Sequence, residues 1–84
     1  MKPREWEAIQ KAGWSSLEQA AHEVLANARG VMRNGMGSYA IAAMIARKAG
    51  THIDPTETYR ACEELKRRGL AKNDAHDPDF WRAA

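Results

Sequence analysis

Residues 54–70, DPTETYRACEELKRRGL, contain the start signal, the periodicity and the stop signal of one amphipathic helix. Asp54 is a suitable N-terminal cap, Pro55 fits the first turn because its missing N–H has no partner inside the helix, and Glu57 completes an Asp-x-x-Glu capping box. Gly69 can adopt the left-handed conformation that ends a helix. The sequence therefore predicts a helix from about Pro55 to Arg68, with an inner stripe made of Thr58, Ala61, Cys62 and Leu65.

The N-terminal segment predicts a short helix from Pro3 to about Ala12. Trp6 and Ile9 lie on one side of this helix, and Gly13 is its stop signal. The first ten residues, MKPREWEAIQ, carry charges where a secretory signal needs an apolar stretch. No run of about 18 apolar residues occurs anywhere, so we expect a cytoplasmic protein without a membrane span.

A second helix is predicted to begin at a capping box formed by Ser15 and Glu18 and to end at Arg29-Gly30. The apolar stripe of this helix consists of Leu17, Ala21, Val24, Leu25 and Ala28. The following VMRNGMG contains two Gly around a Met, one of them in an Asn-Gly pair, and it predicts a connecting loop with a very short strand at Val31-Met32.

A third helix is predicted from Tyr39 to Ala49, capped by Ser38 and closed by Gly50. Its inward side chains are expected to be Ile41, Met44, Ile45 and Ala49. Only four residues separate this helix from the one that starts at Pro55, so the two helices must meet at a sharp angle, with Ile53 packed under the turn.

After Leu70 the chain offers a short extended piece, an Asp-Pro turn and a second extended piece with Phe80 and Trp81. The fold class predicted from this order is mostly α: a winged helix-turn-helix with three to four helices and a small C-terminal β-hairpin. Because 84 residues leave no room for a second core, residues 1–84 are expected to form a single domain.

The net charge of +2, from 13 basic and 11 acidic residues, is too small to establish a nucleic-acid partner by itself. The distribution of charge is more informative. No Asp or Glu occurs in residues 24–53, which contain Arg29, Arg33, Arg47 and Lys48, whereas Asp74, Asp77 and Asp79 gather near the C-terminus. The lone Cys62 excludes an internal disulfide and is expected to be a small buried hydrophobe.

Residues 41–74 resemble the core of winged-helix transcription regulators such as MarR-like and PadR-like repressors. The shared features are a helix rich in small residues that ends in Gly50, an aliphatic Ile53 in the turn, a polar cap, and a Tyr-Arg-Ala-x-Glu-Glu-Leu-type helix that closes with Gly-Leu. Two features depart from this pattern: the turn is about two residues longer than the tightest examples, and the hairpin carries aspartates where many members place Arg or Lys. Phosphate contact by the hairpin is therefore not expected.

The resemblance implies sequence-specific binding of duplex DNA and regulation of transcription, with the helix Pro55–Arg68 in the major groove. With Thr58 pointing inward and ~100° per residue, Thr56, Arg60, Glu63 and Arg67 project outward. Arg60 is the best base-reading candidate, because arginine can bond two acceptors on guanine. The full set of expected DNA contacts is Arg33, Ser38, Tyr39, Lys48, Thr51, His52, Thr56, Tyr59, Arg60 and Arg67.

Several of these residues also have an ordinary structural interpretation. An acidic start and a basic end complement the dipole of the helix, and Glu63 and Glu64 have the spacing of exposed salt bridges with Lys66, Arg67 and Arg68. Tyr59 is equally well read as a boundary residue. A rival function therefore remains open: a small winged-helix module, for example a phage or mobile-element factor, that binds and inhibits a host protein complex.

No nucleophile, base and orienting group stand in a recognisable pattern, so no enzymatic activity and no cofactor are expected. His76 lies among three aspartates, but a solvated turn explains this segment better than a metal site. A regulator of this size is expected to form a homodimer on a two-fold operator, with the N-terminal helix and the Trp81 segment at the seam.

Overall fold

The computed structural model describes residues 2–28 and 35–84. Within these residues the element order is α1 (Pro3–Lys11), α2 (Leu17–Asn27), β1 (Met36–Gly37), α3 (Ser38–Ala49), α4 (Pro55–Arg67), β2 (Ala71–Asn73) and β3 (Phe80–Ala83). The protein is thus mostly helical, as predicted, with four helices and a small antiparallel sheet. The predicted strand at Val31-Met32, the helix end at Arg29-Gly30 and the candidate Arg33 lie outside the described residues.

The predicted C-terminal hairpin is confirmed, and a third strand joins it. The strand order is β1-β3-β2, with β3 antiparallel to both neighbours. β3 is paired with β2 through Lys72 and Arg82, and with β1 through Met36 and Trp81. The central strand of the sheet is therefore the last one in sequence.

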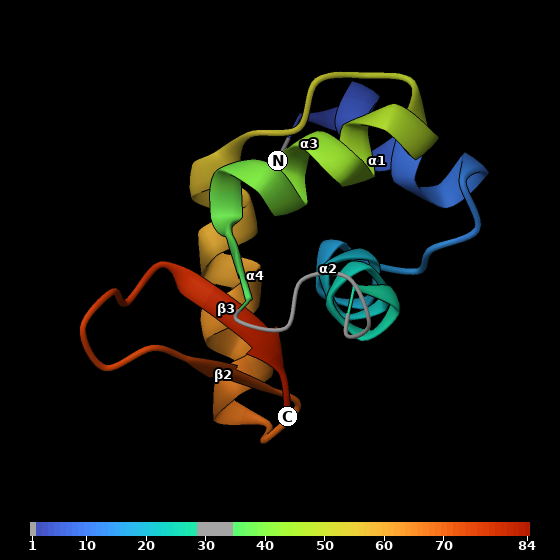
Figure 1. The fold of residues 1–84 in the computed structure, drawn as a ribbon. Helices are drawn as coiled ribbons and strands as arrows, with labels where there is room; N and C mark the ends of the chain where they lie inside the picture. The colour runs from blue at the N-terminus through green and yellow to red at the C-terminus, as the bar shows by residue number, and fades with distance from the viewer. Residues whose placement is uncertain (1, 29–34) are drawn as a thin grey trace.

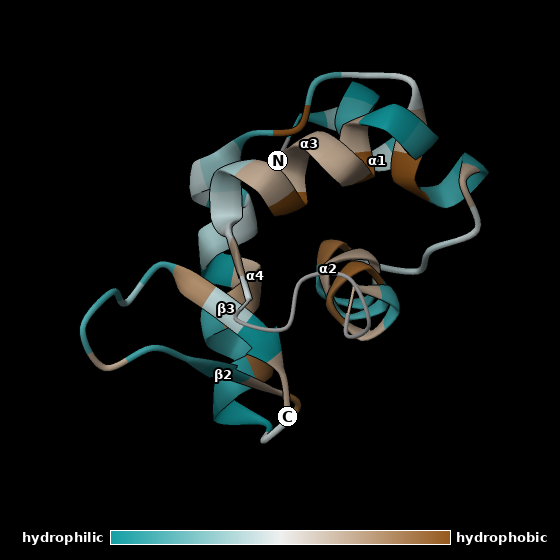
Figure 2. Ribbon diagram, viewed as in Figure 1, coloured by the Kyte–Doolittle hydropathy of each residue, from teal (hydrophilic) through white to brown (hydrophobic). Residues whose placement is uncertain are grey.

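Helix α2 lies in the middle of the molecule and packs against α3, α4 and β3 (Figure 1). Its predicted apolar stripe, Leu17 to Ala28, is buried throughout. The apolar parts of the helices gather around this centre, while much of α4 and most of the loop between β2 and β3 are hydrophilic (Figure 2). Burial of one large aliphatic side chain contributes about 1.5–3 kcal/mol, so this single core supplies most of the stability.

The interior stripe of α4 agrees with the prediction: Thr58, Ala61, Cys62 and Leu65 are all buried. Burial raises the pKa of the Cys62 thiol to about 12, with a smaller contribution from the negative charge of Asp79. The thiol is therefore neutral, as expected for a buried hydrophobe. At the end of α4 the N–H of Leu70 donates to Leu65 O at 2.8 Å, and Gly69 has φ 78°, which is the expected left-handed stop.

Two predicted helix starts are wrong in detail. Helix α2 is capped by Ser16, not by Ser15 and Glu18: the Ser16 hydroxyl accepts from the N–H of Gln19. Helix α3 is preceded by Gly37 as the capping residue, and Ser38 is its first helical residue. The Ser38 side chain does not cap its own helix, because it is bonded to the distant Asp79.

Met44 contradicts its predicted direction, and the two tryptophans Trp6 and Trp81 differ in burial. Met44 is 44% exposed, not inward, because it lies in an open hollow beside Glu23 and Asn27 of α2. Trp6 is 38% exposed, so Ile9 alone anchors α1 in the core. Trp81 is only 1% exposed, so its own side chain packs in the core, and the dimer seam expected at this segment stays a prediction. No helix within the described ranges combines the length and the apolar character that crossing a bilayer requires.

Candidate nucleic-acid interface

The outer side of α4 is uncovered. Thr56, Arg60, Glu63 and Arg67 are all exposed and lie opposite the buried stripe. Helix α1 comes near the start of α4, where Lys2 and Glu5 share a hollow with Asp54 and Glu57. This neighbour lies beside one flank of α4 and leaves its outer side open.

The start of α4 is fixed by two hydrogen bonds around Asp54. The Asp54 carboxylate accepts from the N–H of Thr56 at 2.9 Å, and the Thr58 hydroxyl donates to the backbone oxygen of Asp54 at 3.0 Å. The first bond satisfies one free N–H group of the first turn, and both bonds fix the start of the helix, with Thr56 at its tip. The Arg60 guanidinium lies 3.9 Å from the Glu57 carboxylate, and its side chain is 70% exposed. Such a long, exposed ion pair is weak, so the guanidinium is available to a ligand.

Arg67 is less available than Arg60. Its Nε donates to Glu64 at 2.8 Å and its Nη2 donates to the other carboxylate oxygen at 2.5 Å. Arg68 donates to the same carboxylate at 3.2 Å. The Arg67 hydrogen bond, with help from Arg68, lowers the pKa of Glu64 to about 2, and the same contact raises the pKa of Arg67. A ligand phosphate would have to compete with Glu64 for this guanidinium.

The start of α3 and the turn after it lie beside the start of α4. Tyr39 is 77% exposed, and His52 is exposed as well. Both line a hollow of about 110 Å³ whose floor is apolar; the other lining residues are Ala42, Ala43, Ala46, Ile53 and Pro55. Thr51 precedes His52 in the turn and is half-buried. Tyr39 and His52 therefore lie beside the start of α4, and their DNA contacts stay predictions.

Two residues that were predicted to contact DNA, Lys48 and Ser38, have their side chains on other parts of the protein. The Lys48 ammonium lies 4.7 Å from the centroid of the Trp14 ring, and Lys48 shares a hollow with Met44 and Glu23 on the α2 side of α3. Ser38 is buried, its N–H donates to Asp79 at 3.1 Å, and its hydroxyl donates to the other Asp79 oxygen at 2.9 Å. We therefore leave Lys48 and Ser38 out of the interface.

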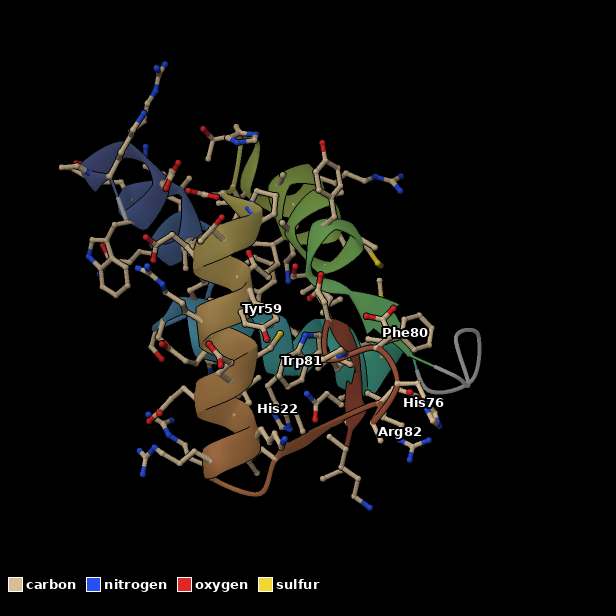
Figure 3. The ribbon with its side chains drawn as sticks, turned by 90° about the vertical axis from the view of Figure 1, so that its left-hand side faces the viewer. His22, Tyr59, His76, Phe80, Trp81 and Arg82 are labelled. Carbon is tan, nitrogen blue, oxygen red and sulfur yellow. The ribbon has the colours of Figure 1, made fainter. Side chains whose placement is uncertain are left out.

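Tyr59 lies where α4 meets the hairpin. Its ring meets the Trp81 ring edge-on, with centroids 5.7 Å apart and planes at 75°, and Figure 3 shows the two rings together between α4 and β3. Tyr59 is half-buried, so the boundary interpretation describes its ring. Its predicted DNA contact stays a prediction.

The aspartates of the hairpin have structural partners. One carboxylate oxygen of Asp74 accepts from the N–H groups of His76 and Asp77, at 2.7 and 3.2 Å. Asp77 accepts from the N–H of Asp79 at 3.2 Å. Asp79 turns inward and also accepts from the Trp81 indole at 3.1 Å. Among the described residues no three His, Cys, Asp or Glu side chains are grouped so that they could hold a metal ion.

Sequence reasoning missed a group of cations beside α4. Lys66, Lys72 and Arg82 line one open groove between the end of α4 and the hairpin. Arg82 points away from the contact between Tyr59 and Trp81 (Figure 3), since neighbouring residues of a strand face opposite sides. The register of the hairpin, Lys72 opposite Arg82, is the signal that would have found this group.

Comparison of the chain with protein-family models, with curated proteins and with solved structures found no match.

Proposed function

We propose that the chain is a winged helix-turn-helix domain that binds duplex DNA in a sequence-specific way and regulates transcription by occupying its site. The order helix, strand, helix, helix, strand, strand from α2 onward, with sheet order β1-β3-β2, supports the winged-helix assignment. The two helices α3 and α4 are joined by a short turn with Ile53 buried beneath it, at 2% exposure. This arrangement is the one in which a second helix is presented to the major groove.

One observation carries the proposal: the outer side of α4 is open. Beside the start of α4 lie two exposed side chains, Tyr39 and His52. With α4 in the major groove, Arg60 donates to the two acceptors of a guanine, and Thr56 contacts a neighbouring base or phosphate. Tyr39, Thr51 and His52 bond phosphates beside the groove. Polar groups beside the groove thus hold the DNA backbone, and Arg60, whose one ion pair among the described residues is long and exposed, reads the sequence.

Fluorescence anisotropy with a labelled random-sequence duplex, across a salt series, tests this proposal. Each phosphate that a Lys or Arg side chain neutralises makes the logarithm of affinity fall with the logarithm of salt by about 0.9, so a few such contacts give a steep slope. Absence of binding at low salt would exclude a DNA-binding function. A selected target site should then bind more tightly than the random duplex at every salt concentration.

A second candidate function is supported by exposed apolar side chains on α3. Tyr39 is 77% and Met44 is 44% exposed, and the net charge is only +2. Such side chains suit a module, for example a phage or mobile-element factor, that binds and inhibits a host protein complex. Binding to a protein partner through these side chains would be nearly independent of salt, and changing Met44 to Ser would weaken it without affecting DNA.

A homodimer remains part of the DNA-binding proposal, because a two-fold operator needs two copies of α4. Trp81 is buried in its own chain, so the contact would use α1, where Trp6 is 38% exposed. Sedimentation at micromolar concentration should show a dimer for the protein and a monomer for the variant Trp6→Ser. A monomeric parent protein would remove the dimer from the proposal.

A further inference from the structure

A hollow between α2 and α3 contains one carboxylate and one ammonium group that do not pair with each other. Its volume is about 170 Å³, and its lining residues are Trp14, Glu23, Val24, Asn27, Met44 and Lys48. Glu23 and Lys48 both belong to the described part of the chain, yet no ion pair joins them. The hollow therefore presents two opposite charges that are separated in space.

The indole of Trp14 holds these two charged groups apart. Its Nε1–H donates to one carboxylate oxygen of Glu23, and the Lys48 ammonium lies 4.7 Å from the centroid of its ring. A cation over the face of an indole is attracted by the electrons of the ring. Trp14 is only 5% exposed, so its ring is a fixed support. Glu23 is thus held at the edge of the ring and Lys48 over its face.

Both charged groups have bonding capacity left for a ligand. The Trp14 indole uses one of the two carboxylate oxygens of Glu23, and a carboxylate can accept several hydrogen bonds. An ammonium has three N–H donors, and its contact with the face of a ring leaves donors free to bond an oxygen. The hollow can therefore form one charged hydrogen bond of each sign.

The remaining wall of the hollow is partly apolar. Val24 is 7% exposed and contributes a buried surface, whereas Met44 is 44% exposed at the rim. A methionine side chain is flexible and polarizable, and it adapts to apolar groups of different shape. The hollow thus offers an apolar surface next to its two charges.

This combination favours a molecule that carries both charges. A simple anion at Lys48 would lie near the Glu23 carboxylate, and a simple cation at Glu23 would lie near the Lys48 ammonium, so each would meet a like charge. A zwitterion with adjacent charged groups satisfies both side chains at once. The volume is below the range of about 300–1,000 Å³ that is typical of pockets for drug-sized ligands, so the molecule must be small.

We propose that this hollow binds a free α-amino acid with an apolar side chain. The ammonium of the amino acid donates to Glu23, its carboxylate accepts from Lys48, and its side chain packs on Val24 and Met44. The lining residues come from α2, α3 and the segment before α2, so the site does not include the outer side of α4. The inference is therefore independent of the proposed function.

A titration with L-leucine, followed by NMR of the ¹⁵N-labelled protein, tests for the site directly. The indole N–H of Trp14 lies beside Glu23, so its resonance should shift with a saturating curve in the millimolar range or below. The indole resonances of Trp6 and Trp81, which do not line the hollow, should stay in place. No shift at Trp14, or equal shifts of all three indoles, would overturn the proposal.

Two half-ligands show whether both charges are recognised. Isoamylamine has the apolar group and the ammonium of leucine without the carboxylate, and isocaproate has the carboxylate without the ammonium. Each should bind at least about tenfold more weakly than L-leucine, because one charged hydrogen bond is lost and one charge of the hollow stays unpaired. If either half-ligand binds as tightly as L-leucine, the site is not one for amino acids.

Two variants assign the charges to their partners. Lys48→Gln and Glu23→Gln should each weaken L-leucine binding by about tenfold, and glutamine at position 23 keeps an oxygen that can accept from the Trp14 indole. Lys48→Gln should not weaken isoamylamine, and Glu23→Gln should not weaken isocaproate, since each variant removes the charge that repels that half-ligand.

The matched control is Arg47→Gln, which removes the neighbouring exposed cation of α3 from outside the hollow. Its affinity for L-leucine should equal that of the parent protein. Equal affinities of Lys48→Gln and Arg47→Gln would overturn the proposal. Thermal denaturation checks that each variant is folded, and the comparison of half-ligands on the parent protein decides the question even where a variant is not.

Discussion

The carboxylate of Asp79 holds the first residue of α3, Ser38, although 41 residues separate the two in sequence. One oxygen accepts from the Ser38 N–H at 3.1 Å and the other accepts from the Ser38 hydroxyl at 2.9 Å. Asp79 therefore supplies from the hairpin the cap that Gly37 lacks. This contact ties the position of α3 to the position of the hairpin.

Removing this carboxylate should destabilise the fold. For Asp79→Ala we expect a loss of about 1–2 kcal/mol in the free energy of unfolding, because a charged cap and the partner of the Trp81 indole disappear together. Urea denaturation measures the change. Glu7→Ala, which removes an exposed carboxylate from α1, is the control and should have almost no effect. Equal stability of the two variants would contradict the capping role.

Ile53 should be the most sensitive position of the turn. Its side chain is 2% exposed beneath the connection between α3 and α4. Ile53→Ala should lower the free energy of unfolding by about 2–5 kcal/mol, whereas Ile53→Val should cost about 0.5–1.5 kcal/mol. Thermal denaturation of the two variants checks this order. Similar melting temperatures for Ile53→Ala and the parent protein would show that the turn does not depend on this packing.

The lowered pKa of Glu64 predicts that the stability of the fold depends on pH in acid. Its pKa is lowered from 4.5 to about 2, chiefly by the hydrogen bond from Arg67. The ionised carboxylate therefore contributes stability that is fully present above about pH 4.5 and is lost as the pH falls toward 2. In urea titrations between these pH values, Glu64→Gln should lose less stability than the parent protein. Glu63→Gln, its exposed neighbour, should follow the parent curve, and parallel curves for all three proteins would contradict the prediction.

Replacement of Arg60 should reduce the sequence specificity of DNA binding. Arg60→Ala should weaken binding to a selected duplex by about 1–3 kcal/mol and should relax the preference for one base pair. The melting temperature should hardly change, since the ion pair with Glu57 is long and exposed, at 3.9 Å. Competition titrations with single-base variants of the site measure both effects. Arg4→Ala on α1 serves as the control, and unaltered affinity of Arg60→Ala would remove Arg60 from the interface.

The sequence by itself determined the helices and the interior side of α4. The caps, the stop at Gly69 and the spacing of Thr58 and Leu65 act within a few residues, so they can be recognised without knowing the rest of the fold. The same local logic identified the turn around Ile53 and placed Arg60 on the open side of the helix. It also identified the hairpin, because the Asp-Pro turn stands between two extended pieces.

Only the tertiary structure decided which surfaces these elements share. The bond between Ser38 and Asp79, the burial of Trp81 and the direction of Lys48 all depend on which segments pack together. The pairing of Lys72 with Arg82 likewise depends on the hairpin register, and a shift of one residue would turn each side chain to the opposite face. Such contacts join segments far apart in the chain, and their energies enter only when the whole core has formed.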